Sequence, residues 1–431
     1  MYKFEGDTEG VMTDVILTQD GTPLKKSLNR ALFHHKLRAF LLIAPLLFFF
    51  ITAYMLPIFS VLYKSVDNDV IYEIIPQTAE MLVKWDPDPN LGLPEAIYAS
   101  FAKEMLVAVK QRNHGRIGVY LNKDIGGLAS KFRRLGRQIK KWNFEDGQSF
   151  KNKFIQADKI WGDTNLWVEI KAYSNRFTLG NFARAVDGQL TAEGFEFRPE
   201  SERFLIKLFS RTLQLSFLIT FVAFVLGYPI AWLMSNVKIK TANLLLIMVL
   251  LPFWTSLLVR TASWRVLLQD TGVLNSSLLW IHEAAPFLFR GAPYDLMYNQ
   301  LAVVIAMTHI LLPFMILPIY SVMKTISPSY TKAAQSMGAN DWTTFWQVYF
   351  PLTLSGVGAG GALVFILSVG YYITPAIVGG TDGIFISNSI ANYIKSNQGL
   401  GAALASILFV CVLILYFVYD RIIGLDKTKL H

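Results

Sequence analysis

The chain has 431 residues, of which 53% are hydrophobic, and a formal net charge of +9 at pH 7. Soluble globular proteins of this length are less apolar, so the composition predicts an integral membrane protein. The positive charge does not indicate nucleic-acid binding, because residues 65–205 hold 20 basic and 19 acidic side chains and the excess lies near the apolar runs. The single cysteine, Cys411, lies inside an apolar run, which excludes a disulfide framework.

The N-terminal region is polar and becomes basic before a long apolar run. We expect residues 1–37 to form a cytoplasmic segment and residues 38–64 to form an uncleaved first transmembrane helix, with its apolar centre at about 39–63. Acidic side chains follow this helix, at Asp67, Asp69 and Glu73. Basic residues before a span and acidic residues after it favour a cytoplasmic N-terminus.

Residues 65–205 have the charge density of a soluble domain, and about 140 residues are enough to bury a core. Residues 93–110 predict an amphipathic helix whose apolar stripe holds Ile97, Phe101, Met105 and Val109. Residues 131–142 predict a second helix with six basic residues and an apolar side made of Phe132, Leu135 and Ile139. Its basic face is either solvated or in contact with lipid head groups or a partner protein. Alternation near Leu166 to Tyr173 indicates strands, so we expect a mixed α/β insert.

Five further apolar runs lie within residues 206–424, each long enough to cross a bilayer as a helix. They cover about 208–234, 242–268, 299–325, 353–379 and 401–423. Six spans that start inside place the N-terminus, the loop 326–352 and the tail 425–431 on the cytoplasmic face. Lys238 and Lys240 agree with this topology, and Arg421, Lys427 and Lys429 do so at the C-terminal end. The insert is then extracytoplasmic.

The loop 326–352 is polar and sharply punctuated. Ser327 followed by Pro328 predicts a helix start, and Gly338 predicts its end. We expect Asp341 to cap a second helix that Pro351 closes. The prediction is two short helices joined by a corner, which is either a plain connection between spans or a surface on which another protein docks.

The chain lacks the motifs of a membrane enzyme. It has no Gly-rich nucleotide-binding motif, no metal-ligand spacing and no paired carboxylates in the spans, so we expect neither catalysis nor a cofactor bound by this chain.

Ionisable and aromatic residues at membrane depth are candidates for a substrate pathway. Arg260 and His309 must face a polar cavity or a partner, because exposure to lipid is costly. They either line a translocation path or have a structural role. The aromatic candidates are either interface anchors or π faces for an organic cation, and they are Trp254, Trp264, Tyr371 and Tyr372.

The segment from Lys332 to Pro351 resembles the cytoplasmic loop of binding-protein-dependent ABC importer permeases. Lys332 stands where that family usually has Glu, whereas the rest of the pattern is matched by Ala333, Ala334, Gly338, Val348 and Pro351. Other stretches resemble the spermidine/putrescine permease branch, namely LGYPIAWLMS from Leu226, LPFWTSLLVRTASW from Leu251, TGVLNSSLL from Thr271, ILLPFMILPIYSVMKTISP from Ile310 and YYITPAIVGG from Tyr371. The insert has no counterpart in most members of that branch.

The resemblance implies an all-α membrane protein with six transmembrane helices of the type I ABC importer permease fold and an insert between helices 1 and 2. It implies a bacterial inner-membrane subunit that works with a second permease subunit, two ATP-binding cassette ATPase subunits holding ATP and Mg²⁺, and a periplasmic substrate-binding protein. Residues 206–424 would be the permease core, and its ATPase-coupling loop would use Lys332, Ala333, Ala334, Gly338, Asp341, Phe345 and Pro351.

The implied substrates are polyamines or related small amino or opine-type metabolites. The alternative is a membrane receptor or scaffold whose external domain binds a ligand and relays to a cytosolic partner.

Overall fold

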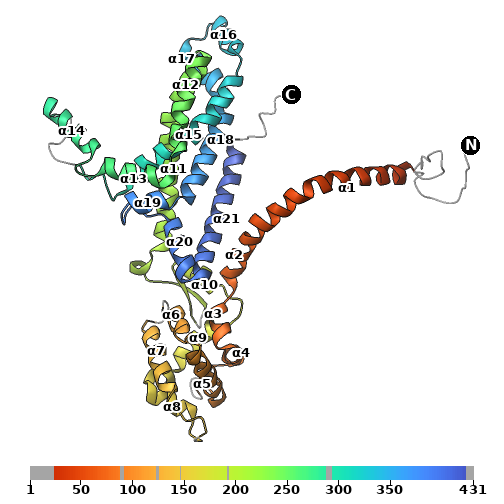
Figure 1. The fold of residues 1–431 in the computed structure, drawn as a ribbon, viewed down its shortest axis with the longest axis vertical. Coiled ribbons are helices and arrows are strands. Elements are labelled where there is room, and N and C mark those ends of the chain that lie inside the picture. Colours follow the sequence, from red (N-terminus) through yellow and green to blue (C-terminus); the bar gives the residue numbers. More distant parts are fainter. Residues whose placement is uncertain are drawn as a thin grey trace, which may run out of the picture. The chain divides into compact units, whose positions relative to one another are not determined.

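The computed structural model describes residues 24–87, 92–122, 126–145, 147–191, 194–287 and 294–423 (Figure 1). The predicted tail 425–431 and most of the predicted segment 1–37, up to residue 23, lie outside the described residues, as do Lys427 and Lys429. The chain divides into two compact units, Met1–Val61 and Leu62–His431, which are described separately.

The first unit contains the predicted first span. Helix α1 (Leu24–Phe50) runs through a π-helical turn, η1 (Ile51–Met55), into α2 (Leu56–Val66), which continues into the second unit. The segment His35–Val66 has a mean hydropathy of 2.4 over its most apolar stretch, which makes it long and apolar enough to cross a membrane.

The insert is mostly helical. Its helices are α3 (Asp69–Ile74), α4 (Pro76–Lys84), α5 (Glu95–Lys110), α6 (Gly115–Leu121), α7 (Leu128–Ile139), α8 (Phe150–Ala157), the 3₁₀ turn η2 (Lys159–Gly162), α9 (Thr164–Ala172) and α10 (Gly180–Ala185). An antiparallel hairpin follows, β1 (Gly188–Thr191) and β2 (Gly194–Phe197), with Gly188 opposite Phe197, and then the 3₁₀ turn η3 (Glu200–Glu202).

The strands predicted near Leu166 to Tyr173 are wrong, because this segment is α9. Leu166, Trp167, Ile170 and Tyr173 are all buried, and this spacing is the period of a helix whose one face lies on the core. Over a few residues, a pattern that contains two adjacent apolar residues does not distinguish the two-residue period of a strand from the 3.6-residue period of a helix. The only strands in the described part of the insert are the two short ones of the hairpin.

The insert has its own aromatic core. Phe101 lies 5.2 Å from Trp167 between ring centroids, and Phe132 lies 5.2 Å from Trp161. The Trp161 carbonyl accepts hydrogen bonds from the Tyr98 hydroxyl at 2.6 Å and from Trp167 Nε1 at 2.9 Å. The apolar faces predicted for the two helices are confirmed, since all seven side chains lie in this core: Ile97, Phe101, Met105, Val109, Phe132, Leu135 and Ile139.

The membrane region contains most of the remaining helices. They are α11 (Leu205–Asn236), α12 (Ile239–Leu250), the 3₁₀ turn η4 (Leu251–Trp254), α13 (Leu257–Leu268), α14 (Val273–Ala284), α15 (Gln300–Thr325), α16 (Pro328–Ser336), α17 (Asp341–Thr344), the π-helical turn η5 (Phe345–Tyr349), α18 (Phe350–Gly370), α19 (Ile373–Val378), α20 (Ile386–Ser396) and α21 (Gln398–Ile423). With the first span, five described helices can cross a membrane, or up to six if one bent pair counts as a span.

Two predicted spans differ from the structure. The run 242–268 is not one straight helix, because Ile239–Trp254 and Leu257–Ala284 meet at a bend of 96°. Pro252 lacks a backbone N–H, and Ser256 starts a new helix by accepting a hydrogen bond from the Val259 N–H at 3.2 Å. The run 353–379 is displaced, since the continuous helix covers Asp341–Gly370 and α19 is separate.

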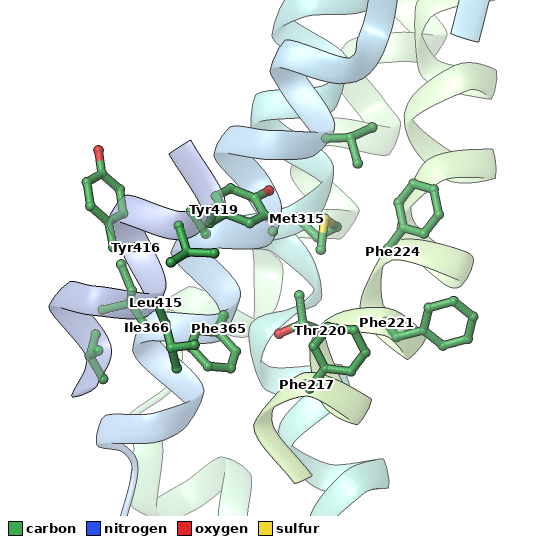
Figure 2. A pocket seen from close by; sticks show the side chains of 15 residues that line it. Phe217, Thr220, Phe221, Phe224, Met315, Phe365, Ile366, Leu415, Tyr416 and Tyr419 are labelled. Carbon is green, nitrogen blue, oxygen red and sulfur yellow. The ribbon is translucent and has the colours of Figure 1, made fainter. Parts of the chain in front are cut away.

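Helices α11, α15 and α18 pack side by side and form the core of the membrane region (Figure 1). Beside them lies an apolar groove of about 410 Å³ whose walls come from α11, α15, α18 and α21 (Figure 2). Its lining is almost entirely aromatic and aliphatic, with Thr220 and two tyrosine hydroxyls as its polar groups, so it offers little to orient a polar substrate.

The two ends of helix α11 lie in different parts of the structure. Its first residue, Leu205, lies in an apolar cluster with Ala185 of the insert and with Leu400 and Leu404 of α21. Its last residue, Asn236, lines a cavity together with α16 and α17. A helix of 32 residues is about 48 Å long, so the insert and the α16–α17 corner lie at opposite ends of α11.

Candidate functional site

The α16–α17 corner begins and turns as its sequence predicts. The Ser327 hydroxyl accepts a hydrogen bond from the Ser329 N–H at 3.4 Å, and Pro328 occupies the first helical turn. Gly338 has φ +92°, a left-handed conformation, and its N–H donates to the Gln335 carbonyl at 3.0 Å. A left-handed glycine after the last turn of a helix reverses the chain without a Cβ penalty.

The cap and the end of the second helix were predicted wrongly. Asn340, not Asp341, caps α17, because its Oδ1 accepts a hydrogen bond from the Thr343 N–H at 2.7 Å. Asp341 instead accepts a hydrogen bond from Gln335 Nε2 at 2.9 Å, which ties α17 to α16. In an Asn-Asp pair either residue can cap, so the sequence alone does not decide between them.

Pro351 does not close the second helix. The helix passes through the π-helical turn η5 and continues into α18, with Pro351 at the start of α18. A proline removes one N–H and crowds the carbonyl one turn earlier, and a wider turn just before it relieves both problems. The same arrangement precedes Pro57, which follows η1 by the same number of residues. The second helix of the corner is therefore the beginning of a membrane span.

The exposed surface of the corner differs from the predicted one. Lys332 and Ala333 are exposed, whereas Ala334 is only 4% exposed and faces the protein. Phe345 is half-buried and lies 6.1 Å from Tyr228 of α11 between ring centroids. The large exposed apolar side chains that the prediction missed are Met337, 83% exposed, and Trp342, 72% exposed. Exposed apolar groups of this size at a rigid turn indicate a surface that another protein covers.

A cavity of about 570 Å³ lies between the corner and the end of α11. Trp232, Ser235 and Asn236 line it from α11, and residues of α15, α16, α17 and η5 line it from the other sides. Phe345 and Phe350 contact Tyr228 of α11, and the cavity separates the rest of the corner from the end of α11.

Four of the predicted pathway residues come together from two helices, α13 and α15, and from the break after α18. Trp264 Nε1 of α13 donates to Nδ1 of His309 on α15 at 3.2 Å, and the two rings lie 5.3 Å apart. Arg260 lies one turn before Trp264 on α13, and a hydrogen bond of 3.0 Å between the Thr261 and Thr374 hydroxyls holds α13 beside α19, just after Tyr371. We call Arg260, Trp264, His309 and Tyr371 the pathway cluster.

Arg260 is the unusual member of the pathway cluster. Its guanidinium lies 5.7 Å from the centre of the Phe253 ring, and its Nε is buried without a hydrogen-bond partner in the described part of the chain. No carboxylate lies within 4.0 Å of it among the described residues. The residue as a whole is partly exposed, but its buried Nε–H favours a hydrogen-bond acceptor or π-electron partner from outside the described chain.

The other two predicted residues lie apart from these contacts. Trp254 is 77% exposed on η4, and Tyr372 is 45% exposed. The Tyr371 carbonyl accepts a hydrogen bond from the Ser387 hydroxyl at 2.6 Å, and the Tyr372 carbonyl accepts one from Asn388 Nδ2 at 2.7 Å. These bonds from α20 fix the break between α18 and α19, and with it the position of Tyr371.

Comparison with known proteins places this region in a family. The family model described as "Binding-protein-dependent transport system inner membrane component" matches residues 209–423, which leaves the insert outside the match. The spermidine/putrescine transport system permease protein PotB of Haemophilus influenzae is 34% identical over 222 residues, covering 51% of this chain and 76% of the relative. The PotB protein of Escherichia coli is 30% identical over 257 residues, covering 59% of this chain and 86% of the relative.

Solved structures with a similar fold include a bacterial alginate ABC transporter in complex with an alginate-bound periplasmic protein, at 16% identity and a TM-score of 0.43 over 52% of this chain and 80% of the other. Matches to both PotB proteins extend over most of their length. The residues matched by the family model, 209–423, include the corner and the pathway cluster. The chain therefore belongs to the family of binding-protein-dependent transport system inner membrane components, as a transport permease and not an enzyme.

Proposed function

We propose that this permease is the membrane-spanning subunit of an ATP-driven importer of polyamines or related small amino or opine-type metabolites. The observation that carries the proposal is the likeness over 222 residues to a spermidine/putrescine permease, together with a family match over 209–423 that holds both the α16–α17 corner and the pathway cluster. The pathway cluster supports a small nitrogenous substrate, because Trp264 and Tyr371 offer π faces to an organic cation.

The expected partners are a second permease subunit, two ATP-binding cassette ATPase subunits and a periplasmic substrate-binding protein. ATP and Mg²⁺ would be held by the ATPase subunits. The chain would lie in the bacterial inner membrane with both termini in the cytoplasm, so that the α16–α17 corner meets an ATPase and the insert, at the other end of α11, meets the binding protein.

The geometry supports a mechanical link between the corner and the pathway cluster. One continuous helix, Asp341–Gly370, spans 30 residues, which is about 45 Å, and Tyr371 follows its last residue. A movement of Asp341 and Gln335 on ATPase closure would therefore shift Tyr371 relative to Arg260 and His309. This is a rigid-body switch between two openings of a pathway.

The pathway cluster does not supply the acidic groups that a polyamine prefers. Arg260 is cationic, and the described membrane region places no carboxylate within 4.0 Å of it. The carboxylates that neutralise a polyamine would come from the second permease subunit and from the binding protein.

Reconstitution tests the proposal. The chain is purified with the subunits that accompany it, placed in proteoliposomes and supplied with binding protein and radiolabelled spermidine. We expect uptake that requires ATP. A preparation that transports without any ATPase present, or that binds ligand and never transports, would contradict the proposal, and the second result would favour a receptor.

A further inference from the structure

Helix α7 of the insert presents a rigid basic face. Its apolar side chains Phe132, Leu135 and Ile139 are at most 1% exposed. Gly136 packs so tightly on His114 that a Cβ would collide with the imidazole ring. Because the apolar side is locked in the core, α7 cannot turn to place those side chains in a bilayer, and only its polar face is available to a partner.

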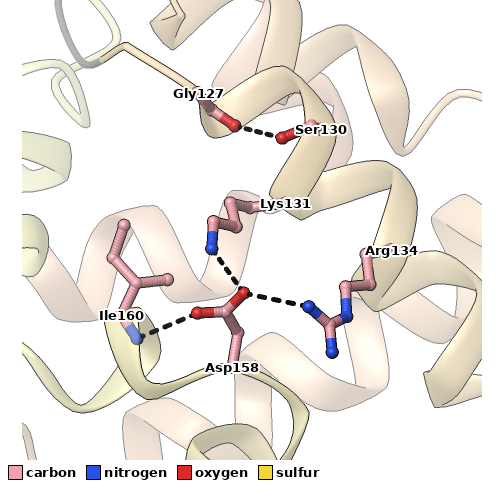
Figure 3. Close-up of polar contacts among 6 residues, drawn as sticks. All are labelled: Gly127, Ser130, Lys131, Arg134, Asp158 and Ile160. Atoms are coloured by element: carbon pink, nitrogen blue, oxygen red, sulfur yellow. Dashed lines mark hydrogen bonds and ion pairs between the residues drawn. The ribbon is translucent and has the colours of Figure 1, made fainter.

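Most of the charge on this face has no internal counter-ion. Asp158 accepts a hydrogen bond from Lys131 Nζ at 2.6 Å and lies 3.7 Å from Arg134 Nη1 (Figure 3). No carboxylate lies within 4.0 Å of the other basic side chains of this segment in the described part of the chain, and these are all exposed: Arg133, Arg137, Lys140 and Lys141.

The concentration of charge is specific to this segment. Residues 131–141 contain six of the 20 basic residues in the range 65–205, so 14 basic and 19 acidic residues remain for the rest of that range. A near-neutral domain with its cations gathered on one helix has a strong local field, which steers and orients an acidic partner.

A polar recess of about 420 Å³ lies at the C-terminal end of α7. Gln138, Lys141 and Trp142 are among its lining residues, and Gln138 Oε1 is buried without a hydrogen-bond partner in the described residues. A ligand that suits the recess brings negative charge for Lys141 and an N–H or O–H donor for Gln138 Oε1.

This combination separates two kinds of anionic surface. A phospholipid brings phosphodiester oxygens that only accept and at most a terminal amine or hydroxyl as a donor, whereas a polypeptide segment brings carboxylates together with a regular series of backbone N–H donors. Among the described residues, α7 exposes no large apolar side chain that would enter a membrane interface. The geometry points to an acidic segment of a soluble protein that docks on Arg133, Arg137 and Lys140 and inserts into the recess beside Gln138. Resting on the proposed function, we assign this partner to the substrate-binding protein.

The test uses the full chain in phosphatidylcholine nanodiscs with its accompanying subunits, and the binding protein isolated with the system as the probe. Kd is measured by biolayer interferometry for wild type, for Arg133→Glu/Arg137→Glu, and for Lys84→Glu/Lys103→Glu, a control with the same charge change on exposed lysines of α4 and α5. We expect the α7 variant to bind about tenfold more weakly, the control to bind like wild type, and wild-type affinity to fall with salt.

A charge-conserving variant and a measurement with lipid vesicles separate the possible causes of weaker binding. Arg133→Lys/Arg137→Lys keeps the charge and should retain most of the affinity, which excludes misfolding as the cause. Equal Kd values for the two Glu variants would overturn the inference, as would an α7 variant that loses only its attraction to vesicles containing phosphatidylglycerol. If the docking inference is overturned but ATP-driven spermidine uptake persists, the proposed function still stands. If the binding protein does not bind and no uptake occurs, the docking inference and the proposed function both fail.

Discussion

Gly338 is the residue on which the geometry of the corner depends most directly. Its φ is +92°, and a Cβ there would meet nothing within 4 Å, so a side chain is opposed by backbone conformation and not by space. We expect Gly338→Val to cost about 1–2 kcal/mol or more locally and to reduce ATP-driven uptake while ATP hydrolysis continues. The measurement is the ratio of uptake to hydrolysis in proteoliposomes.

Two further substitutions check the cause. Gly338→Asn should retain coupling, because Asn adopts the left-handed region more easily than other non-glycine residues. Gly115→Val is the control, since that glycine has open space but no positive φ. Normal coupling in Gly338→Val would show that the corner tolerates a different turn.

Arg260 decides the electrostatic character of the pathway cluster. A cation in the pathway cluster with no carboxylate within 4.0 Å among the described residues should repel a polycation, by roughly 1–2 kcal/mol at an effective dielectric constant near 20 and a separation of about 8–15 Å. We therefore expect Arg260→Gln to lower the KM for spermidine by roughly five- to thirtyfold. The check is the KM for uptake, with Arg265→Gln, an exposed arginine, as the control. A raised KM would indicate that Arg260 binds a carboxylate of the substrate.

At the scale of elements, the sequence predicted where α16 begins and ends, but not where the next helix begins or how it continues. Ser327 and Gly338 act through their own backbone neighbours, so their local pattern was sufficient. Pro351 was misread as a helix end because a proline usually ends a helix, whereas here the π-helical turn η5 just before it lets the helix continue into α18. For the pathway cluster, residue types at membrane depth were enough to nominate Arg260 and His309, whereas the Trp264–His309 bond required the fold.

Asp158, which precedes the η2 turn, links that turn to helix α7 through its contacts with Lys131 and Arg134. The hydrogen bond from Lys131, assisted by the Ile160 N–H and the charge of Arg134, holds the pKa of the Asp158 carboxyl below its ordinary value. A lowered folded-state pKa stabilises the fold above the unfolded-state pKa of about 3.9, and this contribution is lost as pH falls through the folded-state value.

We therefore expect Asp158→Asn to destabilise α7 by about 1 kcal/mol at pH 7 and to have progressively less effect in acid. Hydrogen exchange of α7 amides in the full chain measures this difference. Glu73→Gln, which breaks an exposed pair with Arg116 at 3.0 Å, should change exchange little at either pH. If the loss of α7 stability in Asp158→Asn does not depend on pH, the charge of Asp158 is not its cause.

At the scale of the whole molecule, hydropathy located most of the spans, because a run of about 20 apolar residues has few alternatives in a membrane protein. Six spans were predicted, and the described residues hold five helices that can cross a membrane, or up to six if the bent pair counts as one span. The position of the insert and the corner at opposite ends of α11 agrees with the alternation of spans across a bilayer. The 96° bend between Ile239–Trp254 and Leu257–Ala284 did not follow, since Pro252 alone is compatible with a mild kink. The cytoplasmic and external faces stay predictions from charge.

The continuous helix Asp341–Gly370 leads to the last prediction, which concerns how movement passes through the molecule. Spin labels are placed on a background in which Cys411, the single cysteine, is replaced by Ser. We expect the distance between labels at Met337 and Ile366 to stay constant when the assembled transporter is trapped with nucleotide. The reason is that the corner and the helix Asp341–Gly370, which hold these two positions, should move as one rigid unit. The distance between Asn236 and Met337 should change, since a cavity of about 570 Å³ separates the end of α11 from the corner and leaves room for that movement. A change confined to the Met337–Ile366 pair would mean that the helix bends at η5, in which case the π-helical turn is the hinge and the pathway cluster is not driven by a rigid rod.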